Sequence, residues 1–467
     1  MIFIYSAAIS FLLKVWLGLS FLSFIAVTIL LFILSRFLLF SIFDIEIASA
    51  SDATTAIETP ENASYIVTCC SIEGKLDIPF IVAKIKERAF IHPYYNKLKK
   101  LYKMNFGVCY WQTDPNFSLE NHIEIIEKKF ENNDEVYEFM TYHLGHNRFP
   151  KNIPNWKFFI VPNMPGNMGG VMMKINHGIA DGLSLMSYLL TIGESKEYDL
   201  AKLPKVKGWQ WMIIYILGFF ELIKFYKKLN AKKVDDNCFR QIKLTGKKNC
   251  YCSPSFDLKR LKTYAKTLGV SINDVILALT AKTLRNYHNK TFNKDLKEFS
   301  VMIAASVTPM PQANEIIPLG NNVKILSENL YFDKPNDSFA DYVKQCHLVF
   351  KHLKTSYYIY YQQIAAELNY LLMTMGMQKF LVDKITKAHS AVYSSVPGPT
   401  SAISLFGHDV KDLFFFVTAN AEAALFFNVL TYNERFTFAG MADNATGVDC
   451  KVVIQEFEKL WLQNVGS

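Results

Sequence analysis

The sequence predicts an α/β protein with two sizeable domains and an N-terminal membrane segment. Its 467 residues exceed what one ordinary core holds, since domains commonly contain about 100–200 residues. Short runs of β-favouring residues alternate with stretches of helical character along most of the chain. Hydrophobic residues make up 51% of the chain and charged residues 20%, which provides ample core material and argues against extensive disorder.

The membrane segment is predicted at Val15–Ser35, which contains no charged residue and lies between Lys14 and Arg36. It has the roughly 20 apolar residues that a helix needs to cross a hydrocarbon core of about 30 Å. The core of a signal peptide would be shorter, at roughly 7–15 residues. We therefore expect a retained single-pass anchor within residues 1–48. One basic residue on each flank leaves its orientation open.

A second apolar stretch, Trp209–Tyr226, is followed by Lys227 and Lys228. Two interpretations remain open for it. It is either a core helix or inter-domain linker, or a helix that lies in the membrane interface with aromatic residues at its edge. Because the residues around it lack a clear globular pattern, we expect a linker at 201–245 between domains at 49–200 and 246–467.

Individual segments support the α/β assignment. A strand is expected at Val171–Ile175, leading directly into a turn at His177, and a helix follows at 183–192. Further strands are expected at 65–67, 80–82, 299–307, 412–417 and 423–431, and further helices at 258–268, 273–287 and 452–462. Ser271 is a suitable N-cap for the helix that begins near Asn273.

Charge and cysteine patterns narrow the functional classes. The net charge of +8 is modest for this length, and no basic block is interleaved with base-stacking aromatics, so no nucleic-acid partner is expected. A mildly basic surface would suit anionic headgroups or the phosphates of coenzyme A. The eight cysteines form no CxxC pair and no zinc-type spacing, so no metal site is expected.

The candidate catalytic residue is His177, within the run Asn-His-Gly-Ile-Ala-Asp-Gly at 176–182. A neutral imidazole near pH 7 is the side chain best suited to take a proton from an alcohol that attacks a carbonyl carbon. Gly178 and Gly182 leave room in a tight turn, and Asp181 can fix that turn by accepting hydrogen bonds. The alternative is a loop histidine beside a chance Asp-Gly turn, because a His-x-x-x-Asp-Gly match arises by chance in about a few of a hundred such chains.

Further motifs resemble, in the same order, those of the wax ester synthase/diacylglycerol acyltransferase family, whose signature is His-His-x-x-x-Asp-Gly. The resemblance spans roughly residues 65–465 and leaves the anchor outside. Besides the signature region, the matching segments are Trp111–Asp114 with Phe117 and His122, Pro154–Trp156, Ser271–Val275, Gly320–Asn321, Ser395–Pro399, and Ala442–Asp443 with Asp449. Of these, Trp111, Trp156 and His122 are expected to pack in the core rather than to contact substrate.

The resemblance implies the fold of coenzyme-A-dependent acyltransferases. In that fold, two pseudo-symmetric chloramphenicol-acetyltransferase-like α/β halves with mixed sheets surround a central tunnel. It also implies an O-acyltransferase that moves a fatty acyl group from acyl-CoA to a long-chain alcohol, forming a wax ester, or to diacylglycerol, forming triacylglycerol. His177 would act as the general base in the middle of the tunnel. No covalent acyl-enzyme and no cofactor besides the acyl-CoA substrate would be required.

The remaining site residues also follow from the resemblance. Asn273 is the leading candidate for the donor to the tetrahedral oxyanion, with ordinary helix capping as an equally weighted alternative, and it is grouped as catalytic with His177 and Asp181. Residues expected on the substrate side are Asn176, Gly182, Asp274, Ser394, Ser395, Pro397 and Gly398. Two of these depart from the family pattern: Asn176 replaces the first histidine of the doublet, and Ser395 replaces an asparagine. These departures put in doubt which acceptor the enzyme uses and how fast it reacts, more than they put in doubt the class of reaction.

Two other hypotheses stay open. The departures motivate a catalytically degenerate protein that binds or carries lipid. The third hypothesis is an enzyme that acylates a small polar acceptor, against which the anchor and the apolar composition argue. Because acyl-CoA is cytosolic and the expected products are insoluble, we expect an endoplasmic reticulum anchor, a cytosolic catalytic part and the lipid bilayer as a partner. Asn-x-Ser/Thr triplets begin at residues 62, 116, 289, 336 and 444 and would accept sugar in a lumenal domain. Their glycosylation would contradict the expected topology.

Overall fold

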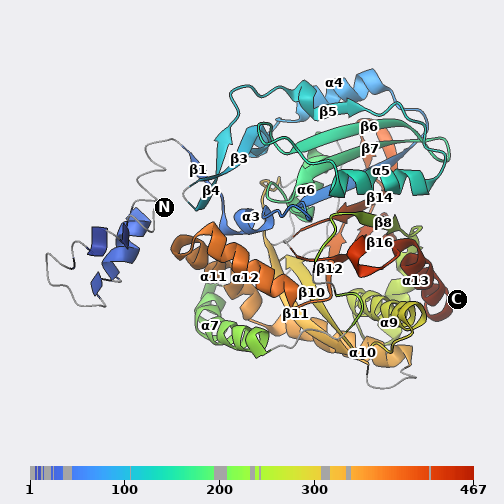
Figure 1. Cartoon of the computed structure of the whole chain (residues 1–467). Coiled ribbons are helices and arrows are strands. Elements are labelled where there is room, and N and C mark those ends of the chain that lie inside the picture. Colours follow the sequence, from blue (N-terminus) through green and yellow to red (C-terminus); the bar gives the residue numbers. More distant parts are fainter. Residues whose placement is uncertain are drawn as a thin grey trace.

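The structure is a computed structural model. It describes residues 45–466, except for residue 106 and the segments 194–207, 232–236, 241–242, 307–315, 333–337 and 420–421, together with scattered residues before 45 (Figure 1). Much of the expected anchor, Val15–Ser35, lies outside the described residues. Within the described part, no individual helix is both long and apolar enough to cross a bilayer. Helices α8 (Leu258–Thr267) and α9 (Ile272–Phe292) meet that test only as a pair bent by 97°.

The first large sheet has six strands in the order β13-β14-β2-β7-β6-β5. Its neighbouring strands are antiparallel, except that β5 and β6 are parallel. Helices α4 and α5 accompany this sheet in the upper part of Figure 1. The strands are β13 (Ser404–Leu405), β14 (His408–Val417), β2 (Tyr65–Glu73), β7 (Met168–Asn176), β6 (Trp156–Met164) and β5 (Ile123–Ile125), and the helices are α4 (Ile78–Arg88) and α5 (Asn133–Gly145).

The second large sheet has seven strands. Six follow the order β11-β10-β12-β15-β16-β8, and β9 also pairs with β16. Strands β10, β12 and β15 are parallel neighbours and the remaining pairs are antiparallel, so both large sheets are mixed, as expected. The strands are β11 (Val323–Tyr331), β10 (Glu298–Ser306), β12 (Ala391–Pro397), β15 (Leu425–Tyr432), β16 (Arg435–Asp443), β8 (Lys248–Cys252) and β9 (Phe256–Asp257).

Strand β14 joins the two halves. It lies late in the sequence, yet it pairs along its length with β2, with Leu413 opposite Cys70 and Val417 opposite Ile66. Its run Leu413–Val417 is buried, because it packs within the core that the first sheet shares with its helices. The N-terminal sheet is therefore completed by C-terminal sequence. The expected domain ranges, 49–200 and 246–467, remain a prediction about folding units.

A small third sheet and several helices complete the described structure. The third sheet has the order β1-β4-β3. Helix α9 lies in the hydrophobic core that covers the second large sheet, where it packs against α8, α10 and α13. The elements not yet given are β1 (Glu46–Ile47), β4 (Val108–Thr113), β3 (Lys100–Asn105), α3 (Ala50–Thr55), η1 (Pro93–Lys99), η2 (Leu119–His122), α6 (Gly182–Ile192), α7 (Gly208–Ala231), α10 (Phe339–Thr355), α11 (Tyr358–Leu372), α12 (Met375–Lys387), η3 (Asn444–Thr446) and α13 (Cys450–Asn464).

Most of the expected elements are confirmed. Strands occur at β2, β7, β10, β14 and β15, and helices at α6, α8, α9 and α13. The expected strand at 80–82 is wrong, because these residues lie in α4. The side chain of Asp77 accepts a hydrogen bond from the Phe80 amide, and a proline occupies the first turn, so local capping outweighs the β-favouring side chains. Trp111, Trp156 and His122 are buried, as expected.

Candidate active site

His177 directly follows the end of β7, and it lies between the two halves of the molecule. The last residue of the strand, Asn176, pairs with Tyr65 of β2, and the His177 amide then donates to the Ser64 carbonyl at 2.8 Å. Helix α6 begins five residues further on, after a turn in which the Ile179 amide donates to the Asn176 carbonyl at 2.9 Å. His177 is half-buried, whereas its neighbours in the turn are buried. The sequence correctly placed this residue in a strand-to-helix turn.

The orientation of the imidazole is set by Asn321. The Nδ1 atom of His177 lies 2.9 Å from the Oδ1 atom of Asn321. The Nδ2 atom of Asn321 donates to the His177 carbonyl at 2.7 Å and to Asp52 Oδ1 at 3.0 Å, so the amide oxygen must be the atom that faces the ring. An amide oxygen can only accept, and therefore Nδ1 carries the ring proton. The Nε2 atom is left with the lone pair that a general base requires.

The surroundings of His177 keep its ring neutral. Burial lowers the pKa of His177 from its usual value of about 6.5, because a charged imidazolium would lose hydration. The hydrogen bond to Asn321 and the carboxylates of Asp181 and Asp52 act in the opposite direction without reversing the shift. At pH 7 the ring is consequently in the form that accepts a proton.

A buried ion pair stands behind Asn321. Asp52, on helix α3, accepts hydrogen bonds through Oδ1 from the backbone amide of Asn321 at 2.9 Å and from its side chain at 3.0 Å. The other carboxylate oxygen of Asp52 lies 2.8 Å from Lys97 Nζ. Lys97 also lies 4.8 Å from the centre of the Trp111 ring, and burial lowers the pKa of this lysine. A chain of contacts therefore runs from Lys97 through Asp52 and Asn321 to His177.

Asp181 closes the motif turn from both sides. Its Oδ1 atom accepts from the amide of Ser184, in a reciprocal capping arrangement at the start of α6. Its Oδ2 atom accepts from the Asn322 amide at 2.9 Å, and its own amide donates to the Gly320 carbonyl at 3.0 Å. These bonds connect the His177 turn to the segment that carries Asn321. The hydrogen bonds of Asp181 thus support the turn and the segment that orients the ring.

Asn176 is buried and both ends of its amide are engaged. Its Oδ1 atom accepts from the Gly178 amide at 2.8 Å, and its Nδ2 atom donates to Glu58 at 2.8 Å. Burial raises the pKa of Glu58, and Arg148, at 3.1 Å, partly offsets this effect. Asn176, which occupies the first position of the doublet, consequently stabilises the turn through buried hydrogen bonds. Its role towards substrate stays a prediction.

The two glycines of the motif allow close packing. A Cβ atom on Gly178 would lie 2.5 Å from the Cβ atom of Ala56, which is closer than nonbonded Cβ contacts in real proteins. A Cβ atom on Gly182 would lie 3.0 Å from Val396 of β12. Gly182 therefore marks the place where the first half meets the expected Val-Pro-Gly-Pro loop of the second half.

The expected residues of the second half form a separate group. Ser395 Oγ donates to Asn273 Oδ1 at 3.0 Å, and both residues are half-buried. Asp274 is buried, where it shares a capping box with Ser271 and lies 2.9 Å from His347 Nδ1. Ser394 precedes Ser395 on β12, and a Cβ atom on Gly398 would clash with the Thr431 carbonyl of β15. The structure thus brings Asn273 and Ser395 together, assigns Asp274 a capping contact, and packs the loop at Pro397–Gly398 against its sheet.

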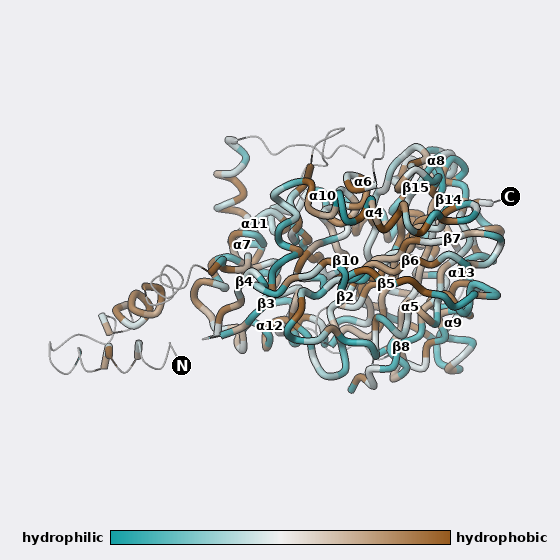
Figure 2. The backbone as a smooth tube through the Cα atoms, turned by 90° about the horizontal axis from the view of Figure 1, so that it is seen from above, coloured by the Kyte–Doolittle hydropathy of each residue, from teal (hydrophilic) through white to brown (hydrophobic). Residues whose placement is uncertain are grey.

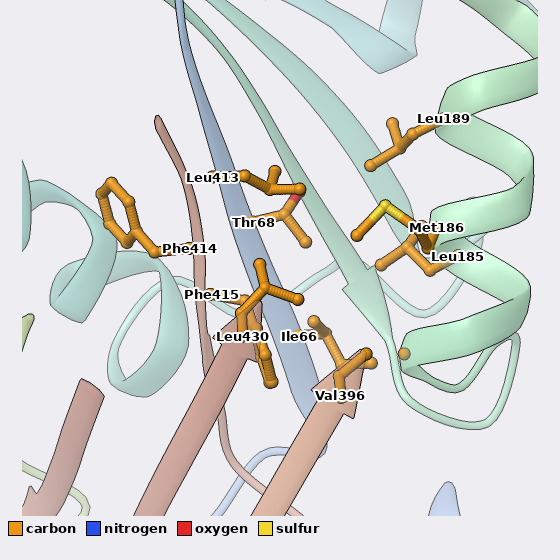
Figure 3. A pocket seen from close by; sticks show the side chains of 11 residues that line it. Ile66, Thr68, Leu185, Met186, Leu189, Val396, Leu413, Phe414, Phe415 and Leu430 are labelled. Carbon is orange, nitrogen blue, oxygen red and sulfur yellow. The ribbon is translucent and has the colours of Figure 1, made fainter. Parts of the chain in front are cut away.

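An apolar pocket adjoins the motif (Figure 3). Gly182, Leu185 and Met186 from the start of α6 form one wall, and Val396 faces them from β12. Strands β2, β14 and β15 complete the wall, so both halves of the molecule contribute. The other lining residues are Ile66, Thr68, Leu189, Leu413, Phe414, Phe415 and Leu430. Almost every side chain of the lining is aliphatic or aromatic, which matches a hydrocarbon chain in chemistry, but the space between them must widen before it can hold one.

Comparison with known proteins identifies the family. Residues 55–205 match the wax ester synthase/diacylglycerol acyltransferase catalytic domain, and residues 319–460 match the WS/DGAT C-terminal domain. The two matches together cover more than half of the chain. The chain belongs to the wax ester synthase/diacylglycerol acyltransferase family. It is accordingly an acyl-CoA-dependent O-acyltransferase, the class expected from the motifs.

Individual relatives agree with this assignment. The chain is 21% identical to wax ester synthase/diacylglycerol acyltransferase 2 of Arabidopsis thaliana, over 73% of this chain and 79% of that protein. It is also 21% identical to the O-acyltransferase WSD of Acinetobacter baylyi, over 71% of this chain and 76% of that protein. The solved structure of the wax ester synthase/diacylglycerol acyltransferase from Marinobacter aquaeolei VT8 has a TM-score of 0.60 at 16% identity, covering 90% of this chain and 99% of that one. That similarity supports the two-half α/β fold.

Sequence reasoning missed three residues of the site. Asn321 was noticed as part of a Gly-Asn motif but was given no role, while Asp52 and Lys97 carry no motif at all. Asp52 also precedes the residues that match the catalytic domain of the family, which begin at 55. A signal that could have drawn attention to Asp52 is the capping pattern Ser49-x-x-Asp52, because it predicts a short helix beside an otherwise polar stretch.

Proposed function

We propose that this enzyme transfers a fatty acyl group from acyl-CoA to the hydroxyl of a long-chain alcohol or of diacylglycerol, with His177 as the general base. The observation that carries the proposal is the contact between Asn321 Oδ1 and His177 Nδ1, because it leaves Nε2 as the proton acceptor. Burial, which lowers the pKa of His177, supports the same role.

The proposed step begins when Nε2 takes the hydroxyl proton as the alcohol oxygen attacks the thioester carbonyl carbon. A tetrahedral intermediate forms, and its collapse breaks the carbon–sulfur bond. The proton on His177 then passes to the departing coenzyme A thiolate. The products are an ester and free coenzyme A, and the ring returns to its starting form without a covalent acyl-enzyme.

The oxyanion of that intermediate needs a hydrogen-bond donor, and we assign this role to Asn273. Ser395 donates to the Oδ1 atom of Asn273, so the Nδ2 atom is the end of the amide that remains to donate. The helix-capping alternative for Asn273 is weakened, because Ser271 and Asp274 make the capping contacts of α9. Ser394, Pro397 and Gly398 would shape the adjoining wall.

The apolar pocket is the proposed site for the acyl or alcohol chain. Its wall begins at Gly182, five residues after His177, so a chain held there would end close to the base.

We further propose that residues 15–35 anchor the enzyme in the endoplasmic reticulum membrane with the catalytic part in the cytosol. Sensitivity of the native protein to endoglycosidase would contradict that topology. Asn62 would not report on it, because it is buried in the fold.

The chemistry is tested with purified full-length protein in detergent. Labelled palmitoyl-CoA is supplied with a panel of long-chain alcohols, diacylglycerol and small polar alcohols, and wild type is compared with His177→Ala. We expect labelled ester from the lipid acceptors and a loss of about 10²–10⁴-fold in kcat for the variant. Equal turnover by both proteins would contradict the role of His177. No turnover by a folded wild type that binds acyl-CoA would favour the degenerate lipid carrier.

A further inference from the structure

The second apolar stretch forms helix α7, which is attached to the body along one narrow stripe. Ile214, Gly218 and Phe225 of this stripe face α11. Gly218 permits a close approach, since a Cβ atom there would lie 2.5 Å from the Cβ atom of Tyr361. The Phe225 ring stacks on Tyr358 with the ring centres 4.7 Å apart.

The position of α7 is further fixed by Glu221. This carboxylate accepts from the Tyr358 amide at 2.7 Å and from Ser356 Oγ at 2.8 Å, so it satisfies the start of α11. The side of α7 that faces away from α11 is therefore presented in a defined orientation.

That outward side is apolar over four turns. Met212 is 67% exposed, Trp209 is 63% exposed and Phe220 is 56% exposed. Contiguous exposed apolar side chains on a soluble protein mark a surface that meets another apolar phase. The other exposed members on α7 are Trp211, Tyr215, Ile216, Leu217, Phe219 and Ile223.

Neighbouring helices extend the surface. Helices α7 and α11 are antiparallel, because Phe225 contacts Tyr358 whereas the earlier residue Gly218 contacts the later residue Tyr361. The last turns of α11 therefore lie beside the first turns of α7. Exposed Leu368 and Leu372 lie on those turns of α11, and exposed Met377 and Phe380 follow on α12. We call these residues, with the exposed apolar residues of α7, the apolar face.

The apolar face lies on the same side of the molecule as the small sheet that contains β1. Figure 1 places α7, α11 and α12 on the same side of the molecule as β1, and Figure 2 places them on the same side as β3 and β4 of the same small sheet. Helix α12 is joined to the small sheet there, because the Met375 amide donates to the Gly107 carbonyl at 3.0 Å.

We propose that the apolar face docks on the surface of a lipid bilayer, with α7 lying in the membrane interface. The tryptophans at the start of α7 have the amphipathic rings that favour the headgroup level. Exposed Lys224 and Lys227 follow the apolar turns, where they can reach anionic headgroups. This arrangement of aromatic, aliphatic and basic residues along one exposed helix fits lipid better than the mixed surface of a protein partner. The proposal does not depend on the acyl-transfer chemistry.

The test measures contact between α7 and lipid by tryptophan fluorescence. Full-length protein carrying Trp16→Phe is bound to vesicles of phosphatidylcholine and phosphatidylserine whose acyl chains carry bromine near the headgroup, and binding is verified by flotation. Trp111, Trp156 and Trp461 are buried, so quenching would report on Trp209 and Trp211. We expect strong quenching in the Trp16→Phe protein and its loss when Trp209→Phe and Trp211→Phe are added.

A matched pair of variants separates the apolar face from general surface hydrophobicity. In the Trp16→Phe protein, Met212→Glu with Phe220→Glu should abolish quenching, whereas Ile125→Glu with Leu462→Glu, on β5 and α13, should leave it unchanged. Vesicle-bound Trp16→Phe protein that is not quenched would overturn the proposal. It would also be overturned if sedimentation in the absence of lipid revealed a dimer that Met212→Glu with Phe220→Glu dissociates, because the face would then be covered by a second copy.

Discussion

The two sides of the candidate site differ in how firmly they are held. On the first side, the ring of His177 is oriented by Asn321, which is held in turn by the buried carboxylate of Asp52. On the second side, Asn273 and Ser395 are half-buried and share one hydrogen bond of 3.0 Å. The proposed base is therefore oriented before substrate arrives, while the proposed oxyanion donor keeps room to adjust. Orientation of the base is expected to set the reaction class, and the second side to set the response to different acceptors.

After the loss of His177 itself, the largest effect on rate is expected on the second side of the site. Asn273→Ala should lower kcat by about 10²–10³-fold, because an oxyanion donor acts in the transition state. Ser395→Ala is the matched variant and should have a smaller effect, since it alters only the orientation of Asn273. Steady-state kinetics with palmitoyl-CoA and one accepted alcohol measure both. A fall in thermal stability with unchanged kcat would return Asn273 to a capping role.

Removing the support of the ring sharpens the same comparison. Asn321→Ala should lower kcat by about 10²-fold, because the imidazole loses its fixed tautomer and orientation. The exposed neighbour Asn322→Ala provides the control, since its backbone amide keeps the bond to Asp181.

Wild-type kcat/KM should fall only as the pH drops below 6.5, because the pKa of His177 is lowered. In wild type, the hydrogen bond from His177 to Asn321 raises the pKa of His177. Asn321→Ala removes this bond, so the acidic limb of the kcat/KM profile should move to still lower pH. Identical profiles would contradict the contact.

The ion pair beneath Asn321 is expected to act mainly on stability. Asp52→Asn leaves Lys97 charged, buried and without its partner, which should cost about 3–5 kcal/mol in the free energy of unfolding. Adding Lys97→Met should recover much of that loss, because no charge remains unpaired. Urea denaturation of wild type, both single variants and the double variant gives the coupling energy. Strictly additive losses would mean that the pair does not stabilise the site.

The smallest effect concerns selectivity at the apolar pocket. Met186→Trp fills the wall next to Gly182 and should reduce activity with palmitoyl-CoA relative to octanoyl-CoA by roughly 10-fold, since overfilling a packed site costs about 1–3 kcal/mol. Met104→Trp, on an exposed strand position, should leave the ratio unchanged. If alcohol length rather than acyl length changes the ratio, the pocket holds the acceptor chain.

Local sequence was informative wherever neighbouring residues determine the structure. The strand before His177, the turn with its glycines, the helix after it and the Ser271 cap of α9 all depend on residues within a few positions of one another, and each is confirmed. The strand expected at 80–82 was wrong because the β-favouring side chains were weighed without the cap at Asp77. Order and spacing of the motifs also sufficed to identify the family, which the comparisons confirm.

The sequence by itself thus determined the two-half α/β class and the acyltransferase family, and it singled out His177 as the residue proposed to react. Tertiary structure decided what holds that histidine, because the backbone of Asn321 and the carboxylate of Asp52 are separated by 269 residues yet lie 2.9 Å apart. It likewise decided that β14 completes the N-terminal sheet and that α7 exposes its apolar side. Contacts of this kind follow from packing of the whole chain, since no local pattern specifies which distant segment will cover a given side chain.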